Sequence, residues 1–250
     1  MQKIPKNIQT RTVYIERIRP FMRTPIVKVL TGHRRVGKSY ILFQLMEDIK
    51  KEEPNANLIY INKEDIAFAD MLTGRDLYDY ISSHLMTDCR NYIFVDEIQE
   101  IQDFRMAIRS LALDEANDIY ITGSNSQMFS SDLANELGGR YVEFRIYSLS
   151  YVEFLQFHDL PDDDESLEKY FHFGGLPYLI HLPLEDRVVM EYINSVYNTI
   201  ILRDVIERRK IRNTTFLEQL VRFLADNVGS LFSMKSISDF LKSQQVKISS

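Results

Sequence analysis

Cysteine is nearly absent from this sequence of 250 residues, and long apolar segments are missing. Cys89 is the only cysteine, so an intrachain disulfide and a cysteine-based metal site are both excluded. No segment approaches the roughly 20 apolar residues that span a bilayer. Residues 1–20 also lack the apolar core of a signal peptide. We therefore expect a cytoplasmic protein without a membrane partner.

The sequence also lacks an excess of positive charge. Its formal net charge is −6 at pH 7 and its pI is about 5.5. This balance argues against nucleic-acid binding over the whole surface, although it allows a local basic patch. A length of 250 residues with 45% hydrophobic residues fits one large globular domain or two small ones.

Apolar strands and amphipathic helices alternate over about the first 150 residues. The predicted strands are 25–32, 56–62, 91–97, 118–125 and 140–149. The predicted helices are 13–21, 38–53, 74–86 and 104–115. Such alternation predicts a parallel α/β sheet of about five strands flanked by helices.

The pattern changes to helices beyond residue 150. An acidic break, PDDDES (161–166), follows the first of these helices, and helical spacing resumes after Glu185. Ser233 is the predicted N-cap of the last helix. We therefore predict an α/β domain over residues 1–150 and an all-α region over residues 151–250.

The stretch LTGHRRVGKS (30–39) joins a predicted strand to a predicted helix with the spacing G-x-x-x-x-G-K-S. Gly32 and Gly37 let the backbone curl so that several N–H groups point at a phosphate, and the next helix adds its positive end. Lys38 would reach the β and γ phosphates, and the Ser39 hydroxyl would hold Mg²⁺. The alternative is a basic turn that matches by chance, which the flanking strand and helix disfavour. The residues expected around the nucleotide are Gly32, His33, Arg34, Arg35, Val36, Gly37, Lys38, Ser39 and Tyr40.

Two carboxylates, Asp96 and Glu97, follow the apolar strand 91–97 directly. Ligands of parallel α/β sheets bind beyond the carboxyl ends of the strands. Asp96 is therefore the expected metal partner of Ser39, and Glu97 would orient or deprotonate the attacking water. The alternative is a solvated strand end.

Small polar residues also end the strand 118–125. Ser124 or Asn125 could hydrogen-bond the γ-phosphate or the attacking water. The alternative is that they only terminate the strand or cap the next helix.

These motifs together resemble those of a known family. The ordered set GHRRVGKS, YIFVDE and YITGSN resembles the ASCE division of P-loop NTPases. The stretches NELGGRYVEFRIYSLSYVEFL, YFHFGGLPYLI and ILRDVIERRKIRN are very similar to landmarks of AAA+-type ATPases of bacteria and archaea that carry a helical C-terminal region. The resemblance covers nearly the whole chain.

The resemblance implies a P-loop sheet in which one strand lies between the strand of the loop and the strand of the aspartate. It implies Mg²⁺-dependent hydrolysis of ATP to ADP and phosphate, coupled to movement of the C-terminal region. ATP is favoured over GTP because the sequence has no guanine-reading N-K-x-D segment.

The resemblance also concerns the arginines. Arg140 matches an arginine that reaches a γ-phosphate in the same or a neighbouring subunit, which is compatible with a homo-oligomer; a surface ion pair is the alternative. Arg34 matches the usual arginine of the loop, whereas His33 stands where proline is usual. Arg35 lies at a variable place and is interpreted as a surface charge.

The last 35 residues (216–250) resemble the opening of a winged helix-turn-helix, whose recognition helix would begin at Ser249 or Ser250. We therefore expect a fragment of a longer protein, with DNA or a protein as the candidate partner of the C-terminal region. Five basic residues could touch a nucleic-acid phosphate or form a solvated helix face: Arg203, Arg208, Arg209, Lys210 and Arg212. A further alternative is that Arg203 faces the nucleotide. Besides an ATPase, a slow ATP-dependent switch and a DNA-binding regulator stay open.

Overall fold

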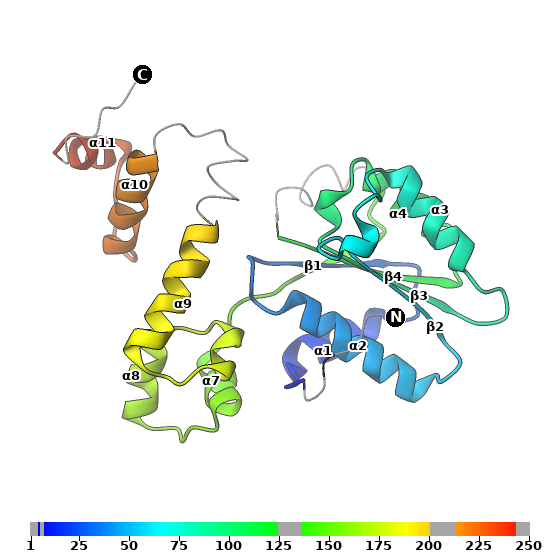
Figure 1. Cartoon of the computed structure of the whole chain (residues 1–250), viewed down its shortest axis with the longest axis horizontal. Helices are drawn as coiled ribbons and strands as arrows, with labels where there is room; N and C mark the ends of the chain where they lie inside the picture. Colours follow the sequence, from blue (N-terminus) through cyan, green and yellow to red (C-terminus); the bar gives the residue numbers. More distant parts are fainter. Residues whose placement is uncertain (1–4, 6–7, 125–136, 201–213, 244–250) are drawn as a thin grey trace. The chain divides into compact units, whose positions relative to one another are not determined.

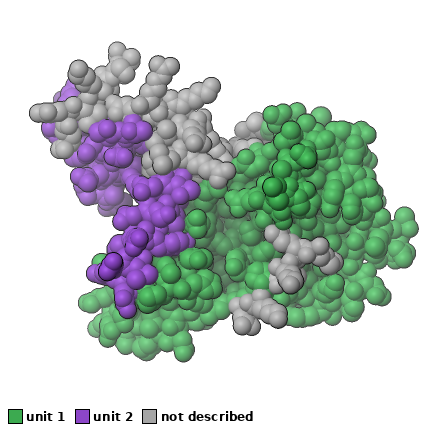
Figure 2. Space-filling model, in the orientation of Figure 1, with its two compact units in different colours: residues 1–184 green, residues 185–250 purple. Residues whose placement is uncertain are grey.

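The computed structural model describes residue 5 and residues 8–124, 137–200 and 214–243. Contacts divide the chain into two units, Met1–Leu184 and Glu185–Ser250 (Figure 2). Residues 151–184 therefore belong to the first unit, whereas the sequence places the change of character near residue 150. The predicted functional boundary between an ATPase domain and a helical region stays a prediction.

One sheet of five parallel strands organises the first unit (Figure 1). The strands are β1 (Val27–Thr31), β2 (Asn57–Asn62), β3 (Asn91–Asp96), β4 (Asn117–Gly123) and β5 (Tyr141–Arg145). Their order is β2-β3-β4-β1-β5, and every neighbouring pair is parallel. The predicted insertion of one strand, β4, between β1 and β3 is confirmed. All carboxyl ends consequently lie at one edge of the sheet.

Helices cover both faces of the sheet. They are α1 (Thr12–Ile18), α2 (Lys38–Glu52), α3 (Gly74–His84) and α4 (Phe104–Leu111). Helices α1 and α2 lie on one face, and α3 and α4 lie on the other (Figure 1). Alternate strand residues supply the two cores: Tyr92 and Phe94 pack with α1 and α2, and Ile93 and Val95 pack with α3 and α4.

Helix α2 buries the face that its spacing predicts. The side chains of this face are all buried: Ile41, Leu42, Leu45, Met46 and Ile49. Because α2 begins at Lys38, its packing fixes the helical end of the loop that precedes it.

Two helices, α7 (Tyr151–His158) and α8 (Asp164–Phe173), follow the sheet in the first unit. The acidic break predicted at 161–166 is shorter than expected, because α8 already begins at Asp164. The Asp163 carboxylate caps α8 by accepting from the Ser166 N–H at 2.8 Å. Acidic residues in the first turn also suit the positive end of a helix.

The second unit contains α9 (Asp186–Thr199), α10 (Thr214–Asp226) and α11 (Met234–Ser243). The predicted cap is confirmed, since the Ser233 hydroxyl accepts from the Ser236 N–H at 3.1 Å. The expected start of a recognition helix and the basic residues of 203–212 lie outside the described residues. None of the helices in the described ranges has the length and apolar character required to cross a membrane.

A buried ion pair between Lys28 and Asp118 joins β1 to β4. Both side chains are 0% exposed. Asp118 also accepts from the Tyr120 hydroxyl at 2.9 Å and from the Arg23 N–H at 2.7 Å. Burial lowers the pKa of Lys28, and the charge of Asp118 opposes that shift. The sequence shows both charged residues within apolar strands, but it does not show that they pair.

Candidate functional site

The loop between β1 and α2 contains two glycines whose φ angles are positive. Gly32 has φ 149°, and a Cβ there would lie 2.3 Å from the Ile146 carbonyl oxygen. Gly37 has φ 92° and is the N-cap of α2. Both positions therefore require glycine, as the sequence pattern predicts.

The loop curls around the ammonium group of Lys38. Its Nζ donates to the carbonyl oxygens of Gly32 and His33, each at 3.1 Å, and lies 3.6 Å from Glu97 Oε1. Burial lowers the pKa of Lys38, while the nearby charges of Glu97 and Asp96 raise it. A cation enclosed by its own loop beside a helix N-terminus fits a polyphosphate, whose oxygens can replace the neutral carbonyls.

Asp96 is the last residue of β3, and its side chain is buried. Its carboxylate accepts from the hydroxyls of Thr122 and Ser39, and from the Tyr60 hydroxyl at 3.0 Å. Burial raises the pKa of Asp96, and the hydrogen bonds from Ser39 and Thr122 oppose that shift. The two residues predicted to bind metal, Ser39 and Asp96, are thus in contact.

A hydroxyl and a carboxylate are hard oxygen ligands that suit Mg²⁺. The described residues contain no group of three or more His, Cys, Asp or Glu that could hold a metal. In nucleotide sites Mg²⁺ commonly takes one or two protein ligands and completes its shell with phosphate and water.

Glu97 is fixed through both its backbone and its carboxylate. Its backbone is left-handed, with φ 54°, and its N–H donates to Thr122 Oγ1 at 3.0 Å. Its carboxylate contacts Lys38 on one oxygen and accepts from the Gln99 side-chain amide on the other. Gln99 was not predicted from the sequence, although it lies only two residues beyond Glu97.

Gln99 connects Glu97 to the end of β4. Its Nε2 lies 3.4 Å from Ser124 Oγ. A carboxylate only accepts hydrogen bonds, so the NH₂ side of the amide must face Glu97. Its Oε1 is buried and finds no hydrogen-bond partner among the described residues, which leaves one acceptor inside the site.

Of the three other residues predicted to act on the γ-phosphate or the attacking water, one lies beside the site described above. Ser124 is half-buried beside Gln99, and Asn125 lies outside the described residues. Arg140 is exposed, and its carbonyl accepts from the Val27 N–H at the amino end of β1. That end is four residues, roughly 13 Å, from the loop. The structure therefore does not bring Arg140 together with the loop of its own chain.

The outer loop residues contact other parts of the first unit. Arg34 pairs with Glu64 at 3.5 Å, and His33 Nε2 lies 3.2 Å from Ser148 Oγ. Arg35 is exposed with φ 66°. Tyr40 is 45% exposed on the first turn of α2. Tyr40 thus has accessible surface next to the loop.

Thr122 and Tyr60 were also missed by the sequence analysis. Thr122 contacts both acidic residues, donating to Asp96 and accepting from the Glu97 N–H. The only available signal was strand order, because β4 pairs with β3 and thereby places Thr122 beside Asp96. Tyr60 comes from β2, which also pairs with β3.

Two family models match this chain. Residues 24–155 match the model described as AAA domain, and residues 164–250 match one described as a domain of unknown function. The first match includes every described residue of the site above.

Two curated relatives, both described as uncharacterised proteins, match over most of this chain. The one from Haemophilus influenzae is 31% identical over 252 residues, which is 98% of this chain and 62% of the relative. The one from Methanocaldococcus jannaschii is 31% identical over 237 residues, 89% of this chain and 52% of the relative. The chain thus spans between half and two thirds of the length of these relatives.

Solved structures resemble the chain more remotely. The Aeropyrum pernix ORC1 protein in complex with DNA has 10% identity and a TM-score of 0.46, covering 98% of this chain and 85% of that chain. Replication initiator DnaA bound to AMPPCP and single-stranded DNA has 16% identity and a TM-score of 0.46, covering 95% and 79%.

Proposed function

Because this chain belongs to the AAA domain family, we propose that it binds ATP with Mg²⁺ at residues 32–39 and hydrolyses it to ADP and phosphate. The observation that carries this proposal is the environment of Lys38. Its Nζ is enclosed by two loop carbonyls at 3.1 Å and faces Glu97 at 3.6 Å. This arrangement puts one cation next to both a phosphate-binding loop and a candidate base.

Phosphoryl transfer needs positioning and charge neutralisation more than covalent chemistry. In the proposed role, loop N–H groups and the N-terminus of α2 hold the phosphates, and Lys38 neutralises charge on their oxygens. Ser39 and Asp96 hold Mg²⁺. Bound Mg²⁺ supplies further neutralisation of the phosphate oxygens.

Glu97 orients the attacking water and accepts its proton in this proposal. Ser124 or Asn125 senses the γ-phosphate. Arg140, which lies at the far end of its own sheet, acts in a neighbouring subunit, so a homo-oligomer completes the site. Hydrolysis is coupled to movement of the C-terminal region.

A slow ATP-dependent switch is the second candidate, and one observation favours it. Both oxygens of the Glu97 carboxylate are engaged, one by Lys38 and one by Gln99. Turnover requires the carboxylate to reach a water, so these contacts would have to loosen. If they persist with ATP bound, the chain changes state on binding and uses hydrolysis only as a reset.

The test measures phosphate release over many turnovers and ATP affinity by calorimetry. Glu97→Gln should lose about a hundredfold or more in kcat and keep ATP binding. Lys38→Met should lose ATP binding, whereas Lys51→Met, whose side chain is 74% exposed on the same helix, should change neither property. Wild-type binding without turnover would favour the switch, and absence of wild-type binding would overturn both candidates.

A further inference from the structure

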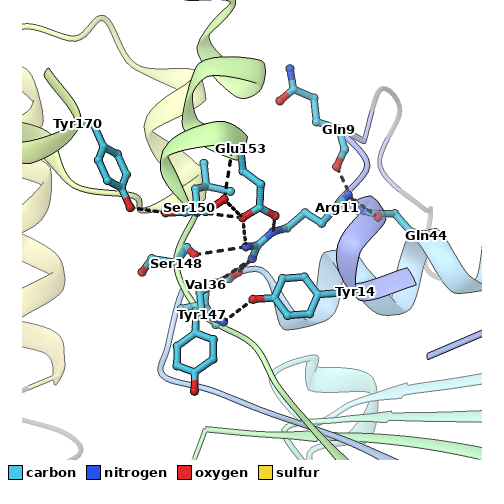
Figure 3. Close-up of polar contacts among 11 residues, drawn as sticks. Gln9, Arg11, Tyr14, Val36, Gln44, Tyr147, Ser148, Ser150, Glu153 and Tyr170 are labelled. Atoms are coloured by element: carbon cyan, nitrogen blue, oxygen red, sulfur yellow. Dashed lines mark hydrogen bonds and ion pairs between the residues drawn. The ribbon is translucent and has the colours of Figure 1, made fainter. Parts of the chain in front are cut away.

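The guanidinium of Arg11 is buried in the first unit, with its side chain only 2% exposed, and lies outside the three nucleotide motifs. Arginine carries five N–H donors in a rigid planar fork. Five hydrogen bonds use them (Figure 3). Two go to the Glu153 carboxylate at 2.8 and 2.9 Å, and three go to backbone carbonyls of Val36 (3.0 Å), Tyr147 (2.8 Å) and Ser148 (3.3 Å). Arg11 therefore joins segments up to 142 residues apart.

The hydrogen bond from Arg11 to the Val36 carbonyl sets the orientation of the peptide group between Val36 and Gly37. Val36 immediately precedes Gly37, and its side chain is fully buried. The peptide group is planar and trans, so its C=O and N–H point in opposite directions. By holding the Val36 carbonyl, Arg11 turns the Gly37 N–H away from itself and fixes the peptide that leads into Lys38.

The contact with Glu153 fixes the beginning of α7. Glu153 is part of a capping box, in which its carboxylate accepts from the Ser150 N–H at 2.9 Å and from the Ser150 hydroxyl at 3.0 Å. The same carboxylate oxygen, Oε2, accepts from Arg11 Nη2 (Figure 3). The charge-assisted pair thus ties Arg11 to the first turn of α7, where the capping box holds the carboxylate in place.

The backbone of Arg11 is itself anchored on α2. Its N–H donates to Gln44 Oε1 at 3.0 Å, and Gln44 Nε2 donates to the Gln9 carbonyl at 3.1 Å (Figure 3). The backbone of Arg11 is consequently fixed by a side chain of α2, the helix that begins at Lys38. Loop, α2 and α7 meet at one rigid side chain.

We propose that Arg11 is a positioning residue for nucleotide binding, which makes the phosphate loop and the start of α7 one mechanical unit. The inference rests on the proposed ATP binding. It identifies the contacts of Arg11 as the route by which ATP binding in the loop affects the stability of α7. Linkage is reciprocal, so nucleotide that stabilises the loop must also stabilise α7 through the same contacts. Arg11 touches no substrate atom in this role.

The first test uses Arg11→Lys, which keeps the charge but replaces the fork with a single ammonium group. We expect the Kd for ATP and the KM to rise about tenfold, the equivalent of one lost charge-assisted hydrogen bond, with kcat at saturating ATP nearly unchanged. Glu153→Gln, placed on α7 and away from the loop, should weaken ATP binding in the same direction. Arg17→Lys, exposed on α1, is the control that should bind ATP like wild type.

The second test is hydrogen exchange with and without ATP. In the wild type, ATP should slow exchange in residues 33–39 and in α7 together. In Arg11→Lys, protection of α7 by ATP should be lost. Wild-type affinity in folded Arg11→Lys, or unchanged protection of α7, would overturn the inference.

Failure of the proposed function would look different. If the wild-type chain binds no ATP, that function and the role of Arg11 in nucleotide binding both fail, and exchange without nucleotide decides whether Arg11 links the loop to α7. Arg11→Lys and Glu153→Gln should then each accelerate exchange in both the loop and α7. Acceleration in only one of the two segments, or in neither, would overturn the mechanical link.

Discussion

Gln99 holds the carboxylate of Glu97 from the side opposite Lys38. The amide donates to Glu97 and also reaches Ser124 Oγ at 3.4 Å, so one side chain joins the end of β3 to the end of β4. Within the part of the chain that the structure describes, its buried Oε1 accepts no hydrogen bond. The geometry therefore assigns Gln99 the task of setting the orientation of the proposed base.

Replacement Gln99→Met tests this task, because methionine has nearly the same volume and no amide. We expect kcat for ATP hydrolysis to fall about tenfold or more as Glu97 loses its orientation, with KM little changed. Gln102→Met, exposed in the same segment, is the matched control. Steady-state phosphate release measures both constants, and equal kcat values in the two variants would contradict the assignment.

Gly32 and Gly138 offer a comparison between two glycines with positive φ. At Gly32 a Cβ would lie 2.3 Å from the Ile146 backbone oxygen, whereas at Gly138 no atom of the described residues lies within 4 Å of that position. Gly32→Ala should reduce the free energy of unfolding by about 3 kcal/mol or more, because a backbone clash adds to the strain. Gly138→Ala should reduce it by only about 1 kcal/mol. Urea unfolding measures both, and equal losses would show that the close approach at Gly32 is relieved elsewhere.

The strands of the sheet and three residues of the candidate site could be predicted, because each is marked by a short local sequence pattern. Apolar runs mark the strands, and Lys38, Asp96 and Glu97 follow strands directly. Parallel strands gather their carboxyl ends at one edge, so residues distant in sequence come together without knowledge of their contacts. The contact of Lys38 with Glu97 across 59 residues follows from that rule, since the two positions are 38 and 97.

The supporting residues could not be predicted because their partners are set by strand order and tertiary packing. Thr122 is one polar residue in an apolar strand until β4 is known to pair with β3, which puts it beside Asp96. Lys28 interrupts an apolar run, and only the pairing of β1 with β4 supplies its counter-charge, Asp118. Nothing in the local pattern around Arg11 indicates a partner at position 153.

The Lys28–Asp118 pair predicts a specific pattern of stabilities. Lys28→Met should cost about 3–5 kcal/mol in unfolding free energy, because it leaves a buried carboxylate without its counter-charge. Adding Asp118→Asn removes that charge and keeps an oxygen for Tyr120 and Arg23. The double variant should therefore be more stable than the single one in urea unfolding. A double variant that is less stable than Lys28→Met would show that Asp118 contributes mainly through its other hydrogen bonds.

Stability should depend on acid pH through Glu153. Burial would raise its pKa, but the hydrogen bonds from Arg11 and Ser150 outweigh burial and hold the pKa below the ordinary value of 4.5. The unfolded chain then binds the proton first, so stability falls as the pH drops below about 4.5 and towards the folded pKa.

The measurement compares unfolding free energies of the wild type and Glu153→Gln between pH 7 and pH 3.5. The advantage of the wild type should be constant well above pH 4.5 and should shrink below it. An advantage that stays constant down to pH 3.5 would show that the carboxylate gains nothing from Arg11.

The span between Arg11 and Glu153 also has a consequence for biosynthesis. The two residues are 142 positions apart, so the arginine leaves the ribosome long before its carboxylate partner is translated. Until α7 has emerged, the Val36 carbonyl and the guanidinium lack the group that locks them together. Because β1 pairs with β4 and β5, which are also translated later, an anchored loop belongs to a late stage of translation. Such long-range closure slows folding, and it delays the anchoring of the proposed nucleotide loop until the chain has been translated as far as α7.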